Sequence, residues 1–142
     1  MTSHRVLIVD DEPSLRRVVE VNLSARGYQV DVAGCGEEAL RLVAAGPDLV
    51  VLDLGLPDMD GLDLLPRLRG RTTGGILVAS ARDPRTTAPM VMAAGATDFL
   101  AKPFSVDQLL AKVRTILAGS RPGGGGGGAP GVSPGGMYRF SA

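Results

Sequence analysis

Short apolar runs recur along the chain, and four of them end directly in polar residues. Runs this short and rich in Val, Leu and Ile are typical of strands buried on both faces of a parallel sheet. The pattern therefore predicts four strands whose carboxyl ends carry reactive side chains. These strands are Val6–Val9 before Asp10 and Asp11, Leu49–Leu52 before Asp53, Ile76–Ala79 before Ser80, and Phe99–Ala101 before Lys102.

The segments between these runs place apolar residues three or four positions apart, which predicts helices. One helix begins near Pro13 and ends near Gly27, and the last covers residues 106–117. A further strand is expected over residues 28–33, which gives five strands and five helices in alternation. Strands separated by helices pair in parallel through right-handed crossovers. We therefore expect an α/β fold in three layers, with a doubly wound parallel sheet.

The composition changes near the end of the chain of 142 residues. Residues 1–118 are predicted to form one domain, and residues 119–136 are rich in Gly and Pro, which is typical of a flexible linker. Residues 137–142, Met-Tyr-Arg-Phe-Ser-Ala, are apolar and aromatic again. We interpret them as the start of a further, truncated domain.

Charge and cysteine content exclude several functions. Lys and Arg total 15 and Asp and Glu total 15, so nothing in the net charge attracts nucleic acid. The single cysteine, Cys35, excludes an internal disulfide. No apolar stretch reaches the roughly 20 residues that span a bilayer, and the first residues do not resemble a signal peptide. We expect a cytoplasmic protein without membrane contact.

The carboxyl ends of parallel strands meet at one edge of the sheet, where ligands bind. Asp10, Asp11 and Asp53 should therefore lie close together there. Each residue alone has a structural explanation: Asp10 and Asp11 could cap a helix, Asp53 and Ser80 could bond a turn, and Lys102 could be surface. Two unit charges about 4 Å apart repel by about 4 kcal/mol at an effective dielectric near 20. Three carboxylates in one place thus indicate a cation.

An oxygen-ligated Mg²⁺ suits this group of acids, because Mg²⁺ takes carboxylates, waters and phosphate oxygens. We expect Asp11 and Asp53 to be direct ligands, Gly55 to contribute its carbonyl, and Asp10 to act through a water. A carboxylate beside such a metal can attack phosphorus and form an aspartyl phosphate. Asp53 is the best-placed nucleophile.

Two further polar residues would stabilise the negative charge of the transferred phosphoryl group. The ammonium of Lys102 would neutralise one phosphoryl oxygen, and the hydroxyl of Ser80 would hydrogen-bond another. Both residues follow predicted strands of the same sheet.

Asp10-Asp11, Asp53, Ser80 and Lys102-Pro103-Phe104, in this order and spacing, resemble the receiver domain of two-component response regulators over residues 4–118. The resemblance implies a flavodoxin-like sheet with strand order 2-1-3-4-5 and a cis peptide before Pro103. It implies Mg²⁺-dependent transfer from the phosphohistidine of a sensor histidine kinase to Asp53. Slow self-dephosphorylation follows, so the chain is expected to be a phosphoacceptor and not an enzyme.

The resemblance also implies a switch. In the family, phosphorylation draws a hydroxyl residue toward the phosphoryl group and lets an aromatic residue swing inward. By position these residues are Ser80 and Phe99. Because Phe99 has no hydroxyl, packing alone would report the phosphorylated state.

Two segments are similar to particular branches of the family. Residues 95–105 resemble OmpR/PhoB-type receivers, which are joined to winged-helix DNA-binding domains, and the loop 53–61 resembles regulators of the Kdp type. The chain is therefore interpreted as the receiver of a transcription regulator. It would contact DNA only through the missing C-terminal domain.

Receivers of this branch often form homodimers through the fourth helix, fifth strand and fifth helix, with charge pairs between copies. Here Ala88 and Gln108 stand where charged residues are usual, and only Asp98 and Lys112 are available as a pair. Pro89 lies inside the expected fourth helix, where proline removes a backbone donor. We expect that helix to be shortened, kinked or to begin near Pro89, so phosphorylation-induced dimerisation is an open hypothesis.

Three alternatives stay open. A stand-alone receiver could act on a partner protein without DNA binding, and an atypical receiver could act without phosphorylation. A metal-dependent phosphohydrolase would use the same Asp53 chemistry. It is disfavoured because Leu54-Gly55 follow Asp53, with no second aspartate two residues on.

Overall fold

Residues 3–119 are described by the computed structural model, and they form one five-stranded parallel sheet with strand order β2-β1-β3-β4-β5. The predicted α/β class and strand order are thus confirmed. Gly119 is the last described residue, so the predicted linker beyond it and the segment 137–142 lie outside the described residues. The strands are β1 (Arg5–Val9), β2 (Gln29–Ala33), β3 (Leu49–Asp53), β4 (Gly75–Ser80) and β5 (Asp98–Ala101).

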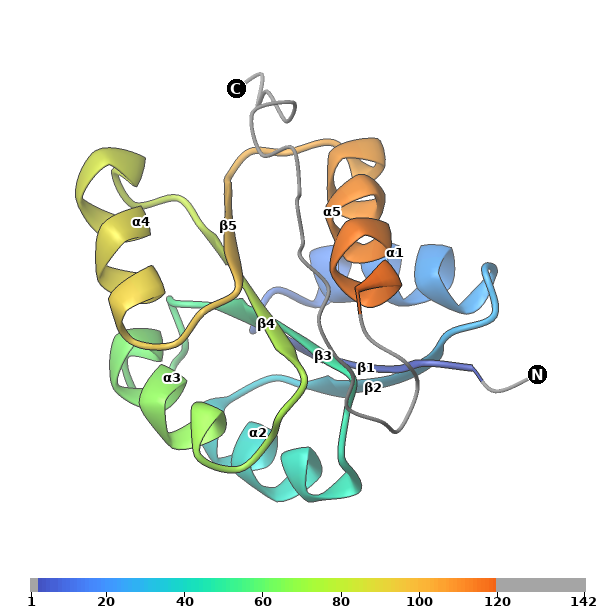
Figure 1. The fold of residues 1–142 in the computed structure, drawn as a ribbon, viewed down its shortest axis with the longest axis horizontal. Coiled ribbons are helices and arrows are strands. Elements are labelled where there is room, and N and C mark those ends of the chain that lie inside the picture. Colours follow the sequence, from blue (N-terminus) through green and yellow to red (C-terminus); the bar gives the residue numbers. More distant parts are fainter. Residues whose placement is uncertain (1–2, 120–142) are drawn as a thin grey trace.

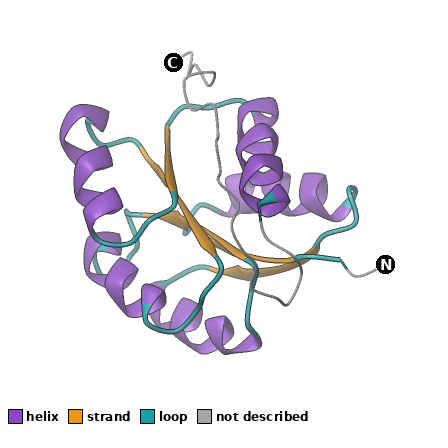
Figure 2. Cartoon of the chain, in the orientation of Figure 1, coloured by secondary structure: helices purple, strands orange, loops and turns teal. Residues whose placement is uncertain are grey.

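Helices cover both faces of the sheet (Figure 1), and the strands lie between two groups of helices (Figure 2). Helices α1 and α5 pack on one face, and α2, α3 and α4 pack on the other. The helices are α1 (Pro13–Ser24), α2 (Gly36–Leu42), which continues into a 3-10 turn at Val43–Ala45, α3 (Gly61–Arg69), α4 (Pro84–Ala93) and α5 (Val106–Ala118). None of the helices in this part of the chain has the length and apolar character needed to cross a membrane.

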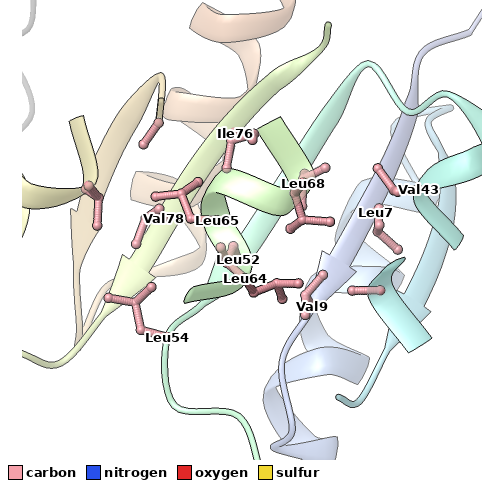
Figure 3. Close-up of a cluster of buried hydrophobic side chains, with 14 of the residues drawn as sticks. Leu7, Val9, Val43, Leu52, Leu54, Leu64, Leu65, Leu68, Ile76 and Val78 are labelled. Atoms are coloured by element: carbon pink, nitrogen blue, oxygen red, sulfur yellow. The ribbon is translucent and has the colours of Figure 1, made fainter. Parts of the chain in front are cut away.

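Alternate strand residues point to opposite faces, and both faces are buried, which explains the continuous apolar runs. Leu7 and Val9 of β1 belong to the cluster under α2, α3 and α4, which Figure 3 shows with Leu64, Leu65 and Leu68 of α3. The intervening strand residues Val6 and Ile8 pack under α1 and α5 instead. Each helix layer therefore has its own core.

The fourth helix was expected to be shortened, kinked or to begin near Pro89, and the structure contradicts the last of these options. Helix α4 begins at Pro84, and Pro89 lies inside it. Pro84 occupies the first turn, where its missing N–H is not needed, and the carboxylate of Asp83 accepts a hydrogen bond from the Arg85 N–H. Val91, fully buried against the sheet, holds the second half of the helix in place. The stabilisation from the N-terminal cap and from the buried face of α4 exceeds the cost of the backbone hydrogen bond that Pro89 removes.

Candidate functional site

Three carboxylates converge at the carboxyl edge of the sheet. Asp10 and Asp11 follow β1, and Asp53 is the last residue of β3. One carboxylate oxygen from each lies within 4.8 Å of the other two. Asp10 is buried, Asp53 is partly buried and Asp11 is exposed, so the group opens to solvent on one side. The predicted acidic cluster is therefore present.

Lys102 supplies the positive charge that these acids require. Its Nζ lies 3.3 Å from Oδ2 of Asp10 and 3.4 Å from Oδ1 of Asp53. The Lys102 N–H donates to the carbonyl of Ser80 at 2.9 Å, and the following Lys102–Pro103 peptide is cis, as predicted. The chain thus turns directly after β5 with the lysine directed at the two acids.

The carboxyl group of Asp53 lies in an environment that disfavours its charge. Burial raises its pKa above the ordinary value, and the negative charge of Asp10 raises it further. The charge of Lys102 and the N–H of Gly55 act in the opposite direction. A partly desolvated carboxylate with one cationic neighbour is poorly hydrated. It therefore gains more from binding an electrophile or a cation than an exposed aspartate would.

Ser80 and Phe99, the predicted switch pair, lie on the neighbouring strands β4 and β5. Ser80 is only 2% exposed, and its Oγ accepts a hydrogen bond from the Arg82 N–H at 3.0 Å. Phe99 is buried in the cluster that includes Val91 of α4. The aromatic ring is therefore already inward in this structure, and its role as a switch stays a prediction.

The loop after Asp53 is held by contacts that sequence reasoning missed. Asp58 accepts hydrogen bonds from the N–H groups of Gly36 and Glu37 at the start of α2, at 2.8 and 3.0 Å. These donors lower the pKa of the Asp58 carboxyl. Asp60 caps α3 by accepting from the Leu62 N–H at 2.9 Å. An aspartate just before Gly61 is a recognisable helix start, but nothing in the sequence links Asp58 to α2.

Gly55 and Gly61 shape the same loop. Gly55 bridges to Asp60 in antiparallel fashion, and the Gly61 N–H donates to the Leu54 carbonyl at 2.8 Å. A Cβ on Gly61 would lie 2.4 Å from the Cα of Leu54, so only glycine fits there. Gly55 lies beside the Asp53 carboxylate, and its carbonyl as a metal ligand stays a prediction.

The residues of the predicted dimer face have partners within the chain. Lys112 is 5% exposed, and its Nζ lies 2.8 Å from Oδ2 of Asp98. Gln108, which stands where an acid is usual, completes a capping box with Ser105 at the start of α5. Ala88, the other such position, packs against the core. These substitutions therefore serve the fold of the single chain.

A groove of about 570 Å³ adjoins the site on the side of α1. Its apolar lining comes from Leu15 and Val18 of α1 and from Pro103 and Phe104 after β5. Lys102 stands at the boundary between this groove and the acidic cluster. A partner bound in the groove would therefore lie next to Asp53.

Residues 6–114 match the family described as the response regulator receiver domain. The chain belongs to this family. The acidic cluster of Asp10, Asp11 and Asp53 is a pocket of the kind at which receiver domains typically bind Mg²⁺. Receiver domains of response regulators interact with histidine kinases. The family resemblance predicted from the sequence is thus confirmed.

Curated relatives are named as regulators. The transcriptional regulatory protein KdpE of Mycobacterium tuberculosis is 48% identical over 113 residues, which are 79% of this chain and 50% of that protein. The response regulator MprA of Mycobacterium leprae is 42% identical over 122 residues, 83% of this chain and 53% of that protein. The chain therefore spans about half the length of the curated relatives that it matches. The match to KdpE agrees with the predicted resemblance to Kdp-type regulators.

Solved receiver structures share the fold. A two-component response regulator from Clostridium difficile has a TM-score of 0.78 at 28% identity, over 82% of this chain and 97% of that one. A response regulator from Burkholderia pseudomallei has a TM-score of 0.72 at 32% identity, over 77% of this chain and 65% of that one. The latter was solved with a phosphorylated aspartic acid, a calcium ion and citrate. Both likenesses support the predicted flavodoxin-like architecture.

Proposed function

We propose that this chain is the phosphoacceptor of a two-component system and that Asp53 receives the phosphoryl group from the phosphohistidine of a sensor kinase. The observation that carries the proposal is the position of the Asp53 carboxylate, which lies within 4.8 Å of carboxylate oxygens of Asp10 and Asp11 and 3.4 Å from Nζ of Lys102. A partly buried carboxylate with a lysine at 3.4 Å is suited to attack phosphorus.

In this reaction an oxygen of Asp53 forms a bond to phosphorus as the bond from phosphorus to the histidine nitrogen breaks. The products are an aspartyl phosphate and an imidazole, whose released nitrogen keeps the electron pair of the broken bond and takes up one proton from solvent to become neutral. Lys102 moves from the Asp53 carboxylate to a phosphoryl oxygen and keeps its contact with Asp10. Ser80 turns its hydroxyl toward a second oxygen. Preorganised donors of this kind stabilise the charge that develops during transfer.

The acidic cluster fits a divalent metal, because three carboxylate oxygens lie within 4.8 Å of one another and one side of the group is open. Asp10, Asp11 and Asp53 would hold Mg²⁺, with the Gly55 carbonyl as a further ligand. When bound, Mg²⁺ would supply charge neutralisation at the phosphoryl oxygens. The protein would then dephosphorylate slowly by itself and turn over no other substrate.

The groove beside Lys102 is the proposed docking place of the phosphodonor. Leu15, Val18, Pro103 and Phe104 offer an apolar surface that a helix of the kinase could cover, and Glu12 lies at the edge of the groove. The site and the groove share Lys102, so a docked kinase would bring its phosphohistidine to Asp53. Because the donor acts inside the cell, a cytoplasmic location belongs to the same proposal.

The output is proposed to be transcriptional. KdpE of Mycobacterium tuberculosis is named a transcriptional regulatory protein, and this chain matches half of its length. A winged-helix domain following the receiver would bind the DNA. A homodimer through α4, β5 and α5 would use apolar contacts, since Met90 and Met92 of α4 are exposed and Lys112 is engaged within its own chain. A stand-alone receiver is the alternative.

Intact mass spectrometry tests the proposal. The protein is incubated with phosphoramidate and Mg²⁺, and we expect a gain of one phosphoryl group that disappears in Asp53→Asn and after chelation of the metal. Asp63→Asn, which removes an exposed carboxylate in the first turn of α3, is the control and should gain the group normally. A folded wild-type protein that gains no phosphoryl group would contradict the proposal.

A further inference from the structure

Arg82 links the two loops that flank the phosphoacceptor. It belongs to the short connection between β4 and α4, two residues after Ser80. Its Nη2 lies 3.0 Å from Oδ1 of Asp60 and 3.5 Å from the carbonyl oxygen of Leu54, the residue that follows Asp53. One guanidinium group thus joins the β4–α4 connection to both ends of the loop 54–60.

The backbone of Arg82 holds the predicted switch hydroxyl. Its N–H donates to Oγ of Ser80 at 3.0 Å. If Ser80 turns its hydroxyl toward a phosphoryl group on Asp53, this backbone contact is lost. The backbone contact of Arg82 therefore depends on the orientation of the Ser80 hydroxyl.

Phosphorylation of Asp53 would create a second anionic group that competes with Asp60 for the guanidinium of Arg82. Before the reaction Asp60 offers a single negative charge, and its carboxylate is 43% exposed, so the ion pair is weakened by solvent. An aspartyl phosphate would place a group of roughly twice that charge one residue from Leu54. Arginine binds phosphoryl oxygens through two parallel N–H groups, which is stronger than one exposed contact to a carboxylate.

We propose that Arg82 is a phosphorylation-sensitive latch, which pairs with Asp60 in the unphosphorylated protein and exchanges that carboxylate for the phosphoryl group on Asp53. The inference rests on the proposed function of Asp53. Arg82 is a positioning residue before transfer, because it fixes the β4–α4 connection against the loop 54–60. After transfer it releases α3 and carries the connection, with the start of α4, toward Asp53.

The latch makes a prediction that a purely structural contact does not make. Asp60→Asn removes the competing charge but keeps a side-chain oxygen that can cap α3. The freed guanidinium then favours the phosphorylated state. The ratio of phosphorylated to unphosphorylated protein, at steady state with limiting phosphoramidate and Mg²⁺, should rise by a factor of about 1.4 to 5, the range that corresponds to an exposed ion pair. Arg82→Gln should lower the same ratio.

The double variant with Asp60→Asn and Arg82→Gln tests whether Asp60 acts on phosphorylation through Arg82. In the Arg82→Gln background, Asp60→Asn should leave the ratio unchanged, because no guanidinium remains to be released. Arg82→Lys keeps the charge without the paired N–H groups and should fall between wild type and Arg82→Gln. The control is Arg85→Gln, which removes an arginine three positions along that pairs with Asp83 at 3.2 Å on the surface. It should leave the ratio as in wild type.

The outcomes separate the latch from the proposed function. If all variants gain the phosphoryl group and Asp60→Asn has the same effect in both backgrounds, or none in either, the latch is wrong while the phosphoacceptor assignment stands. If wild type itself gains no phosphoryl group, the proposed function fails and the latch with it. Circular dichroism of each variant confirms that the compared proteins are folded.

Discussion

Replacing Gly61 by alanine tests how the phosphoacceptor loop is built. The added Cβ would lie 2.4 Å from Cα and 2.9 Å from Cδ2 of Leu54, and 3.0 Å from the carbonyl oxygen of Asp53. The first and last of these atoms belong to the backbone at the end of β3, so they cannot move as a side chain could. Overpacking costs of order 1–3 kcal/mol, and we take the upper end here. Alanine recovers up to about 1 kcal/mol through the unfolded state, which leaves a net loss of about 2 kcal/mol.

Urea unfolding measures this loss. With a slope of about 2 kcal/mol per molar, the midpoint of Gly61→Ala should fall by about 1 M. Gly70→Ala is the matched control at the other end of α3, because its Cβ would meet only atoms at 3.7 and 3.8 Å and its φ is −75°. That variant should be neutral or more stable by up to about 1 kcal/mol. Equal midpoints for the two variants would refute the close approach of α3 to Leu54.

Three further substitutions probe the site and its surroundings. Lys102→Gln removes the cation beside Asp53 and should slow phosphorylation by about 10², measured as the initial rate with phosphoramidate; an unchanged rate would exclude the proposed role of the lysine. Asp58 has a lowered pKa, so its contribution to stability is present above the ordinary value of 3.8 and is lost as the pH falls through the folded value. Asp58→Asn should therefore have a lower Tm than wild type at pH 7, and the difference should close in acid; a constant difference would contradict the assignment. Lys112→Met removes the cation that pairs with Oδ2 of Asp98 and should destabilise the monomer by about 1–2 kcal/mol in urea. Unchanged stability would mean that the Asp98–Lys112 pair does not support the single chain.

The sequence predicts the parallel sheet well because its strands are buried on both faces. Runs such as Val6–Val9 then contain no polar interruption, and the polar residues that follow mark the carboxyl edge. The positions of Asp10, Asp53 and Lys102 follow from that edge. The same reasoning predicts, without any measured distance, that three acids and one lysine lie close together at this edge.

Contacts between segments far apart in the chain were not predictable. Asp58 accepts a hydrogen bond from the Gly36 N–H at the start of α2, although the two residues are 22 positions apart in the sequence. Arg82, in the connection before α4, pairs with Asp60, in the loop before α3. No local pattern marks such pairs, since each residue alone is an ordinary polar loop residue. Arg82 escaped notice for a second reason, because it follows Ser80 in a segment where only the hydroxyl has a recognisable role.

The fourth helix shows where local propensity was misleading. Pro89 predicted a helix that is shortened, kinked or begins near Pro89, but Asp83 and Pro84 start the helix before that residue and Val91 packs its second half against the sheet. The cost of one missing hydrogen bond is small beside the burial of that face. Lys112, by contrast, is buried in a contact with Asp98 of its own chain, and its role between two copies stays a prediction.

Locating the phosphoryl group tests the central claim most directly. The protein phosphorylated with phosphoramidate and Mg²⁺ is reduced with borohydride, which converts an aspartyl phosphate to homoserine, and its peptides are sequenced by tandem mass spectrometry. We predict homoserine at position 53, between Leu52 and Leu54. Reduction at another aspartate, or a stable phosphoryl group on any other side chain, would contradict the assignment of Asp53 as the phosphoacceptor.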